Sequence, residues 1–340
     1  MANLLTDPSM INMEPVKSQD NIVLKVKNLK KYFPIRRGFF QHISNWVKAV
    51  DGVDFEIEKG GTLGLVGESG CGKSTVARLI LKLLEPDEGS IVFQGREISD
   101  LSEKDIKPLR TKMQIVFQDP FGSLNPRMTV GQTIEEGLRI LGIEKRQRKE
   151  RVKELIEMVG ISAESSNRYP HEFSGGQRQR IGVARALSVE PSLIIYDEPV
   201  SALDVSIQAQ IINLVKGLQE QFDLSYLFIS HDLDVVGYLS DKVAVMYLGH
   251  IMEYASVEEL FKAPLHPYTQ ALLAAAPKPE PDNKFKMQCL AGDVPSPVNP
   301  PPGCKFQGRC PLVEAQCRKE VGFHKAREGH MVRCWKVAER

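Results

Sequence analysis

A glycine-rich stretch near residue 70 has the composition and spacing needed to hold phosphate groups. Residues 67–74 read Gly-Glu-Ser-Gly-Cys-Gly-Lys-Ser and match the pattern G-x-x-x-x-G-K-[ST]. Glycines let backbone N–H groups curl around phosphate oxygens with no Cβ in the way, and the helix expected next points its positive end at them. In this pattern Lys73 reaches the β- and γ-phosphates and Ser74 holds Mg²⁺. The stretch, called the phosphate loop below, therefore predicts a nucleotide site.

A pair of acids at the end of an apolar run could supply the remaining chemistry. Residues 193–198 read Leu-Ile-Ile-Tyr-Asp-Glu, which predicts a buried strand that ends in Asp197 and Glu198. Asp197 suits the Mg²⁺ ligand of a phosphate-loop ATPase, and Glu198 would orient or deprotonate the attacking water. Taken alone, such a strand usually marks only a polar strand end. Its value comes from its pairing with Lys73 and Ser74.

A second glycine-rich helix start lies about 20 residues before the acidic pair. Residues 173–177, called the signature segment below, read Phe-Ser-Gly-Gly-Gln and precede a helix expected over 177–188. Ser174 is a suitable N-cap, and a capped helix start with adjacent glycines is another anion site. An ordinary glycine-rich cap is the alternative. Two anion sites so far apart in sequence indicate two ligands, or one ligand held from two sides.

Further polar residues follow short apolar strands. Gln118 ends a strand expected over 113–117, and His231 follows one expected over 225–229. The carboxyl ends of strands are where open α/β sheets place their ligands, although a lone histidine after a strand is more often structural. The order strand 63–66, phosphate loop and amphipathic helix indicates an α/β protein.

The rest of the chain supplies the framework for these residues. Residues 22–33 and 48–58 alternate as half-buried strands, and 144–160 and 206–222 have helical periodicity. The charged face of 144–160 is interpreted as solvated. Prolines crowd 264–302, so residues 263–340, called the C-terminal extension below, are expected to be an appended segment.

Composition excludes several classes of protein. The 340 residues are 42% hydrophobic and carry 44 Lys and Arg against 43 Asp and Glu, a net charge of +1. The length predicts about two domains, and the absence of a basic excess argues against nucleic acid as a partner. The chain contains no run of 18 apolar residues, the length that a membrane-spanning helix needs. Residues 1–21 are expected to be a flexible leader with no secretory pattern, which predicts a cytoplasmic protein.

Four cysteines of the C-terminal extension have the spacing Cys304-x5-Cys310-x6-Cys317-x16-Cys334. Cytosolic thiols are kept reduced, so the group indicates a metal site before it indicates disulfides. Four thiolates suit zinc or an iron–sulfur cluster, and the wide spacing favours the cluster. Cys289 has no place in this spacing. Cys71 is interpreted as a small residue that fits the phosphate loop, and its place at a helix start could lower the pKa of its thiol.

Together these motifs resemble the nucleotide-binding subunit of an ABC transporter, over residues 22 to about 262. The match rests on the phosphate loop, Gln118, the signature segment, the acidic strand, residues 201–204 (Ser-Ala-Leu-Asp) and His231. The resemblance implies a P-loop NTPase with a RecA-like α/β core, an antiparallel β-subdomain and an inserted helical subdomain at about 119–190. A Cys-rich C-terminal extension would follow.

The resemblance also implies a role for each matched residue. Two cassettes would meet head to tail with two ATP molecules between them, and the signature segment of one would complete the site of the other. Glu198, His231 and Lys73 would be catalytic, and Ser74, Gln118 and Asp197 would hold Mg²⁺. The residues expected to bind nucleotide are Tyr32 (stacked on adenine), Gly67, Glu68, Ser69, Gly70, Cys71, Gly72, Lys73, Ser74, Thr75, Gln118, Ser174, Gly175, Gly176, Gln177 and Asp204 (across the dimer seam).

A narrower resemblance, to the dipeptide/oligopeptide importer ATPases, rests on residues 117–126, on His-Pro-Tyr-Thr at 266–269 and on the proline-rich stretches at 295–297 and 300–304. It implies a second, different ATPase chain, two membrane permeases and an extracytoplasmic peptide-binding protein, with this chain on the cytoplasmic face of the membrane. Some members carry a [4Fe–4S] cluster in this tail. Nickel or glutathione is the alternative cargo, and a soluble ABC ATPase acting on DNA or ribosomes is the third hypothesis.

Overall fold

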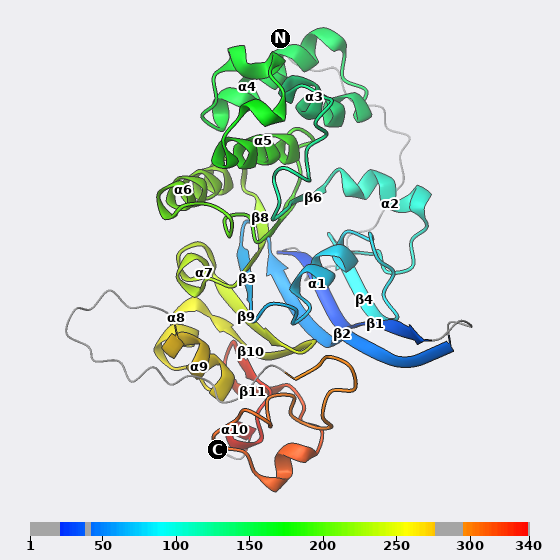
Figure 1. Cartoon of the computed structure of the whole chain (residues 1–340), viewed down its shortest axis with the longest axis vertical. Coiled ribbons are helices and arrows are strands. Elements are labelled where there is room, and N and C mark those ends of the chain that lie inside the picture. The colour runs from blue at the N-terminus through cyan, green and yellow to red at the C-terminus, as the bar shows by residue number, and fades with distance from the viewer. Residues whose placement is uncertain (1–20, 38–41, 276–294, 339–340) are drawn as a thin grey trace, which may run out of the picture.

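The computed structural model describes residues 21–37, 42–275 and 295–338 of the chain. The predicted flexible leader lies outside these ranges except for Asn21, and so does Cys289. Figure 1 shows three regions along the long axis of the molecule: a group of helices at one end, the sheets in the middle, and the C-terminal extension at the other end.

The centre of the molecule is an eight-stranded sheet that carries the phosphate loop. Its strands β3, β7 and β8 are buried along their whole length, as expected of parallel strands covered on both faces. β3 pairs in parallel with β8 and β9, and β7 pairs in parallel with β6 and β8. In spatial order the strands are β11 (His324–Arg327), β12 (His330–Val332), β10 (His250–Ser256), β9 (Lys242–Tyr247), β3 (Thr62–Val66), β8 (Ser225–Ser230), β7 (Leu193–Asp197) and β6 (Met113–Val116).

A smaller antiparallel sheet packs on the same core. Its strands run in the order β2 (His42–Glu58), β1 (Ile22–Arg37), β4 (Glu88–Phe93) and β5 (Arg96–Glu97). The alternation predicted for 48–58 is confirmed, because Val50, Val53, Phe55 and Ile57 are all buried. They pack in one apolar cluster with helix α1 (Lys73–Ile80), which fixes the phosphate loop between the two sheets.

Most helices connect strands of the main sheet along the chain. The helical group of Figure 1 contains α3 (Val130–Ile140), α4 (Lys145–Met158) and α5 (Gly175–Leu187), inserted between β6 and β7. The other helices are α2 (Glu103–Arg110), α6 (Val205–Phe222), α7 (Leu233–Leu239), α8 (Val257–Lys262), α9 (Pro267–Ala275) and α10 (Trp335–Ala338). Within the described ranges, none of the helices combines the length and apolar character needed to cross a bilayer.

The C-terminal extension is joined to the main sheet, which the sequence did not predict. Strand β12 pairs with β10 through Glu253↔Val332 and Tyr254↔Met331. Glu253 is fully buried and accepts hydrogen bonds from the backbone N–H groups of Leu265 (2.7 Å) and His266 (2.9 Å). Its Oε1 lies 2.7 Å from Nε2 of His330. The extension is therefore anchored by sheet pairing and by a buried carboxylate.

Candidate nucleotide site

The phosphate loop connects β3 to α1 and is shaped by glycines that no other residue could replace. Gly67 has φ 155° and Gly72 has φ 114°. A Cβ at Gly67 would lie 2.1 Å from the carbonyl oxygen of Met246, and one at Gly72 would lie 2.1 Å from that of Ala49. Backbone therefore approaches backbone at both positions, and the glycines let the loop curl tightly enough to surround a phosphate.

Lys73 and Ser74 are held in place by the loop and by the acidic strand. The side chain of Lys73 is only 4% exposed, and its Nζ donates to the carbonyl oxygens of Gly67 (2.8 Å) and Glu68 (3.1 Å). The hydroxyl of Ser74 donates to Oδ1 of Asp197 at 2.9 Å. The structure thus brings the two halves of the predicted site together, although they are far apart in sequence.

Glu198 lies where the predicted catalytic residues meet. Its Oε2 accepts from Nε2 of Gln118 at 3.2 Å and lies 3.4 Å from Nδ1 of His231, while its Oε1 is 3.7 Å from Nζ of Lys73. Glu198 also has φ 49°, a left-handed conformation that is unfavourable for a residue with a side chain. Such strain is typical of functional positions.

The oxygen-bearing side chains near the loop suit a magnesium ion. Burial raises the pKa of Asp197, the hydrogen bond from Ser74 opposes this shift, and the neighbouring Glu198 charge adds to it. A hydroxyl, a carboxylate and the amide oxygen of Gln118 are the kind of ligands that Mg²⁺ prefers. A divalent cation here would compensate the carboxylate charge that burial disfavours.

A cavity of about 230 Å³ lies over the phosphate loop. Three of its lining residues were not predicted. Val47 and Ala49 come from β2, and Pro297 comes from the C-terminal extension. The extension reaches this position through a backbone hydrogen bond from Lys48 N–H to the carbonyl of Pro297 (3.3 Å). The lining residues are Val47, Ala49, Ser69, Gly70, Gly72, Lys73, Ser74, Thr75, Gln118, Glu198 and Pro297.

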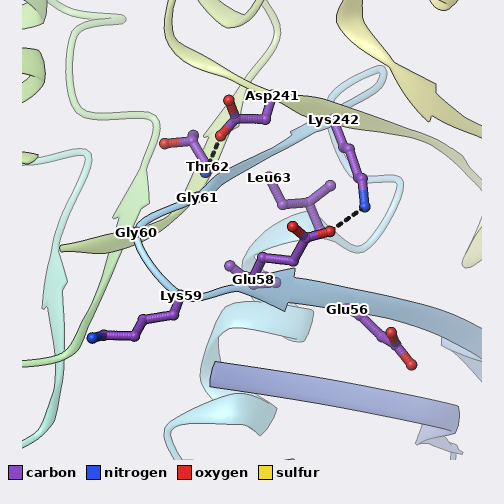
Figure 2. A pocket seen from close by; sticks show the side chains of 10 residues that line it. Glu56, Glu58, Lys59, Gly60, Gly61, Thr62, Leu63, Asp241 and Lys242 are labelled. Atoms are coloured by element: carbon purple, nitrogen blue, oxygen red, sulfur yellow. Dashed lines mark hydrogen bonds and ion pairs between the residues drawn. The ribbon is translucent and has the colours of Figure 1, made fainter. Parts of the chain in front are cut away.

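A second hollow, of about 270 Å³, lies at the amino end of β3, opposite to the phosphate loop. Figure 2 shows Glu58 paired with Lys242 and Asp241 facing the start of β3. Lys242 Nζ lies 2.6 Å from Glu58, and Asp241 accepts from the N–H of Thr62 at 2.7 Å. These charged groups already have partners within the chain, and none of the residues singled out by the sequence motifs lines this hollow.

The structure does not place Tyr32 at the phosphate loop. The Tyr32 hydroxyl donates to Asp51, and Nζ of Lys48 lies 5.1 Å from the centre of its ring. Tyr32 lines a different cavity, of about 460 Å³, between the small sheet and the C-terminal extension. Its neighbour Phe33 points to the opposite face, because side chains alternate along a strand, and it pairs with Val47 of the loop cavity. Phe33 is therefore the aromatic residue of this segment that shares a strand face with Val47.

The signature segment is well formed but lies away from this cavity. The hydroxyl of Ser174 accepts from the N–H of Gln177 (3.3 Å), and the Gln177 side chain accepts from the N–H of Ser174 (3.0 Å). A Cβ at Gly176 would lie 2.4 Å from Cγ2 of Ile207, so packing on α6 alone requires this glycine. Ser174, Gly175, Gln177 and Asp204 are exposed. They can meet a ligand held by another chain.

The cysteines of the C-terminal extension lie in one region, and the predicted metal site is not confirmed. Within the described residues, no three His, Cys, Asp or Glu side chains are close enough together to hold a metal ion. Burial raises the pKa of the Cys304 thiol to about 11, and the nearby Cys310, Cys317 and Cys334 add to this shift. The expectation that the pKa of the Cys71 thiol is lowered is wrong, because burial raises the pKa of this thiol.

Comparison with solved structures defines the class of protein. The fold is similar to cbiO1 from Clostridium perfringens, part of an ABC transporter complex, with a TM-score of 0.62 and 28% identity over 72% of this chain and 92% of that chain. It is also similar to MJ0796, a dimeric bacterial ABC transporter cassette, with a TM-score of 0.61 and 27% identity over 69% and 98%. Residues 50–201 match the ABC transporter family. The fold and the site are those of an ABC ATPase cassette.

More similar relatives define the family. Residues 252–317 match the C-terminal region of oligopeptide/dipeptide transporters. The chain is 54% identical over 317 residues to the oligopeptide transport ATP-binding protein AppF of Bacillus subtilis, covering 92% of this chain and 96% of AppF. It is 48% identical over 332 residues to OppF of Salmonella typhimurium, covering 96% and 99%. The chain belongs to the ATP-binding subunits of the oligopeptide/dipeptide ABC transporter family.

Proposed function

We propose that this chain hydrolyses ATP to drive the uptake of dipeptides or oligopeptides across the cytoplasmic membrane. The observation that carries the proposal is the meeting of Lys73, Ser74 and Asp197 with Glu198 at one cavity. The similarity to AppF and OppF, which are named for oligopeptide transport, supports the cargo.

Each residue of the cavity has a role that follows from its contacts. The phosphate loop and Lys73 bind the β- and γ-phosphates, and the Lys73 amine exchanges its bonds to loop carbonyls for bonds to phosphate oxygens. Ser74, Asp197 and Gln118 would hold Mg²⁺, which neutralises phosphate charge. Glu198, oriented by Gln118 and His231, positions and deprotonates the attacking water.

The adenine ring would stack on Phe33 in place of Tyr32. Phe33 shares its strand face with Val47, which lines the loop cavity, whereas Tyr32 is engaged by Asp51 and Lys48. A half-buried aromatic ring beside a phosphate site is a suitable surface for a base. Asp204 and the signature segment would then contact the ATP of a second cassette.

The partners follow from the exposed signature segment and from the family. Ser174 and Gly175 are exposed, and MJ0796 forms a dimer of cassettes. We infer a second, different ATPase chain, two permeases and an extracytoplasmic peptide-binding protein, with this chain on the cytoplasmic face of the membrane and no nucleic acid as a partner.

The cysteines of the C-terminal extension would hold a [4Fe–4S] cluster, with zinc as the alternative. Raised thiol pKa values disfavour the thiolates unless a cation is bound. The wide spacing of the four cysteines in the sequence favours a cluster, which is a larger object than a single ion. Its role would be to stabilise the extension.

Transport by the assembled complex tests the proposal. The chain, its partner ATPase and both permeases are reconstituted into vesicles with the binding protein, and ATP-dependent uptake of labelled dipeptides, oligopeptides, nickel and glutathione is measured. The proposal predicts peptide uptake that Lys73→Ala abolishes. Uptake of nickel or glutathione alone would contradict the cargo, and ATP-independent uptake would contradict the motor.

A further inference from the structure

The C-terminal extension contacts the phosphate loop at Glu68. Nη1 of Arg309 lies 3.0 Å from Oε1 and 2.8 Å from Oε2 of Glu68. The side chain of Arg309 is 8% exposed and that of Glu68 is 22% exposed. This ion pair is therefore largely shielded from water, unlike a surface pair whose contribution is small.

The backbone of Glu68 is held by a second group from the extension. The N–H of Glu68 donates to the hydroxyl of Tyr268 at 3.0 Å. Tyr268 is fully buried, and its ring centre lies 4.7 Å from that of Tyr247 and 5.3 Å from that of Phe306. Glu68 is thus fixed at its side chain by Arg309 and at its backbone by an immobile tyrosine.

The same residue supports the lysine that binds phosphate. The carbonyl oxygen of Glu68 accepts from Nζ of Lys73 at 3.1 Å. A displacement of Glu68 would therefore move both the loop backbone and the resting position of the Lys73 amine.

Charge gives Arg309 a second effect. A carboxylate on the phosphate loop repels a triphosphate unless a cation neutralises it and holds it aside. Burial of the guanidinium has the largest single effect and lowers its pKa, but the hydrogen bonds to Glu68 and Tyr247 and the Glu68 charge together hold the pKa of Arg309 above its ordinary value. Arg309 therefore remains a cation beside Glu68.

We propose that Arg309 and Tyr268 of the C-terminal extension position Glu68 and thereby hold the phosphate loop ready to bind nucleotide. Arg309 is a positioning residue, since it acts through Glu68 and does not line the loop cavity. The proposal rests on the nucleotide site proposed above. It gives the extension a part in ATP affinity, exerted through Glu68, that the sequence motifs do not predict.

The test measures binding of a fluorescent ATP analogue with Mg²⁺ to the full-length chain. We expect Arg309→Met to raise the dissociation constant about tenfold, within the range typical of coupling between contacting groups. Arg309→Lys should restore part of the affinity, because it keeps the charge but loses the planar guanidinium. In the assembled transporter the KM for ATP should rise, with kcat changed less than about twofold, since the loss falls on ground-state binding.

A double-variant cycle distinguishes positioning from a general effect of charge. If Arg309 acts through Glu68, Arg309→Met should have little effect in a Glu68→Gln background. The matched control is Arg327→Met, which breaks the exposed pair between Arg327 of the same extension and Glu259 of α8 and should leave affinity unchanged. Tyr268→Phe removes only the hydroxyl and should weaken binding by a smaller factor, without opening a cavity.

Four outcomes would overturn the proposal. Unchanged affinity in Arg309→Met is one, and an equal loss of affinity with and without Glu68→Gln is another. The third is a loss of affinity that Arg327→Met matches, and the fourth is a loss that is fully explained by a fall in the thermal unfolding temperature. Lys73→Ala tests the nucleotide site separately from Arg309. The affinity of the Lys73→Ala protein for the ATP analogue should fall even if Arg309 has no effect on binding.

Discussion

The phosphate loop and the signature segment are both glycine-rich helix starts, but only the first is surrounded by partners. Lys73 and Ser74 meet Asp197 and Glu198 across the sheet, within one chain. The signature segment has a complete capping box at Ser174, yet it is exposed and away from the loop cavity. The difference fits the proposal that one chain builds one side of an ATP site and supplies the opposite side to another chain.

The largest expected effect breaks the side that the chain builds alone. Lys73→Ala should abolish nucleotide binding in practice and lower the ATPase kcat/KM about 1,000-fold, because the amine that meets the phosphate charge is lost. Binding of labelled ATP and phosphate release check this. Near-normal turnover would contradict the assignment of the phosphate loop.

Glu198→Gln separates binding from hydrolysis. Turnover should fall about 100-fold or more, as expected when a general base is removed, while ATP still binds. The trapped ATP should stabilise the dimer with the partner cassette, which size-exclusion chromatography with light scattering detects. Only monomers in the presence of ATP and both cassettes would argue strongly against a shared site.

Ser174→Ala tests the exposed half. It should leave ATP binding by this chain unchanged but lower hydrolysis in the assembled pair about tenfold, because the partner's ATP loses a donor. Thr129→Ala is the matched control, since Thr129 and Gln132 form the same capping box at the start of α3. Both variants should lose about 1 kcal/mol of stability. An equal loss of hydrolysis in both would show that Ser174 acts only as a helix N-cap and does not contact the partner's ATP.

The smallest expected effect concerns the cysteines, which lie in neither half. Cys310→Ser should remove iron and sulfide from the purified protein and lower the thermal unfolding temperature, with ATP binding reduced only slightly. Cys71→Ser is the control, and it should leave metal content unchanged. Unchanged iron and zinc in Cys310→Ser would refute a metal site at these cysteines.

Local motifs predicted most of this site because the chemistry of each is contained in a few adjacent residues. The phosphate loop, the acidic strand and Gln118 meet as expected, since parallel strands bring their carboxyl ends to one edge of the sheet. Helix α3 was missed, although Thr129 and Gln132 give the capping-box signal for its start.

The remaining contributions depend on register and on distant contacts. A bulge between Lys31 and Tyr32 shifts the pairing of β1 with β2, and a one-residue shift exchanges the faces of a strand. The sequence alone therefore does not tell whether Tyr32 or Phe33 faces the phosphate loop. Strands β11 and β12 are too short for periodicity to reveal them. Arg309 reaches Glu68 from 241 positions away, and neither residue alone indicates that contact.

A structure of the ATP-loaded Glu198→Gln protein with its partner cassette tests the shared site most directly. The account predicts that Ser174 and Gly175 of this chain lie against the γ-phosphate of the ATP bound to the partner's phosphate loop. A nucleotide-loaded assembly in which residues 174–177 face open solvent, with no neighbouring phosphate, would contradict it.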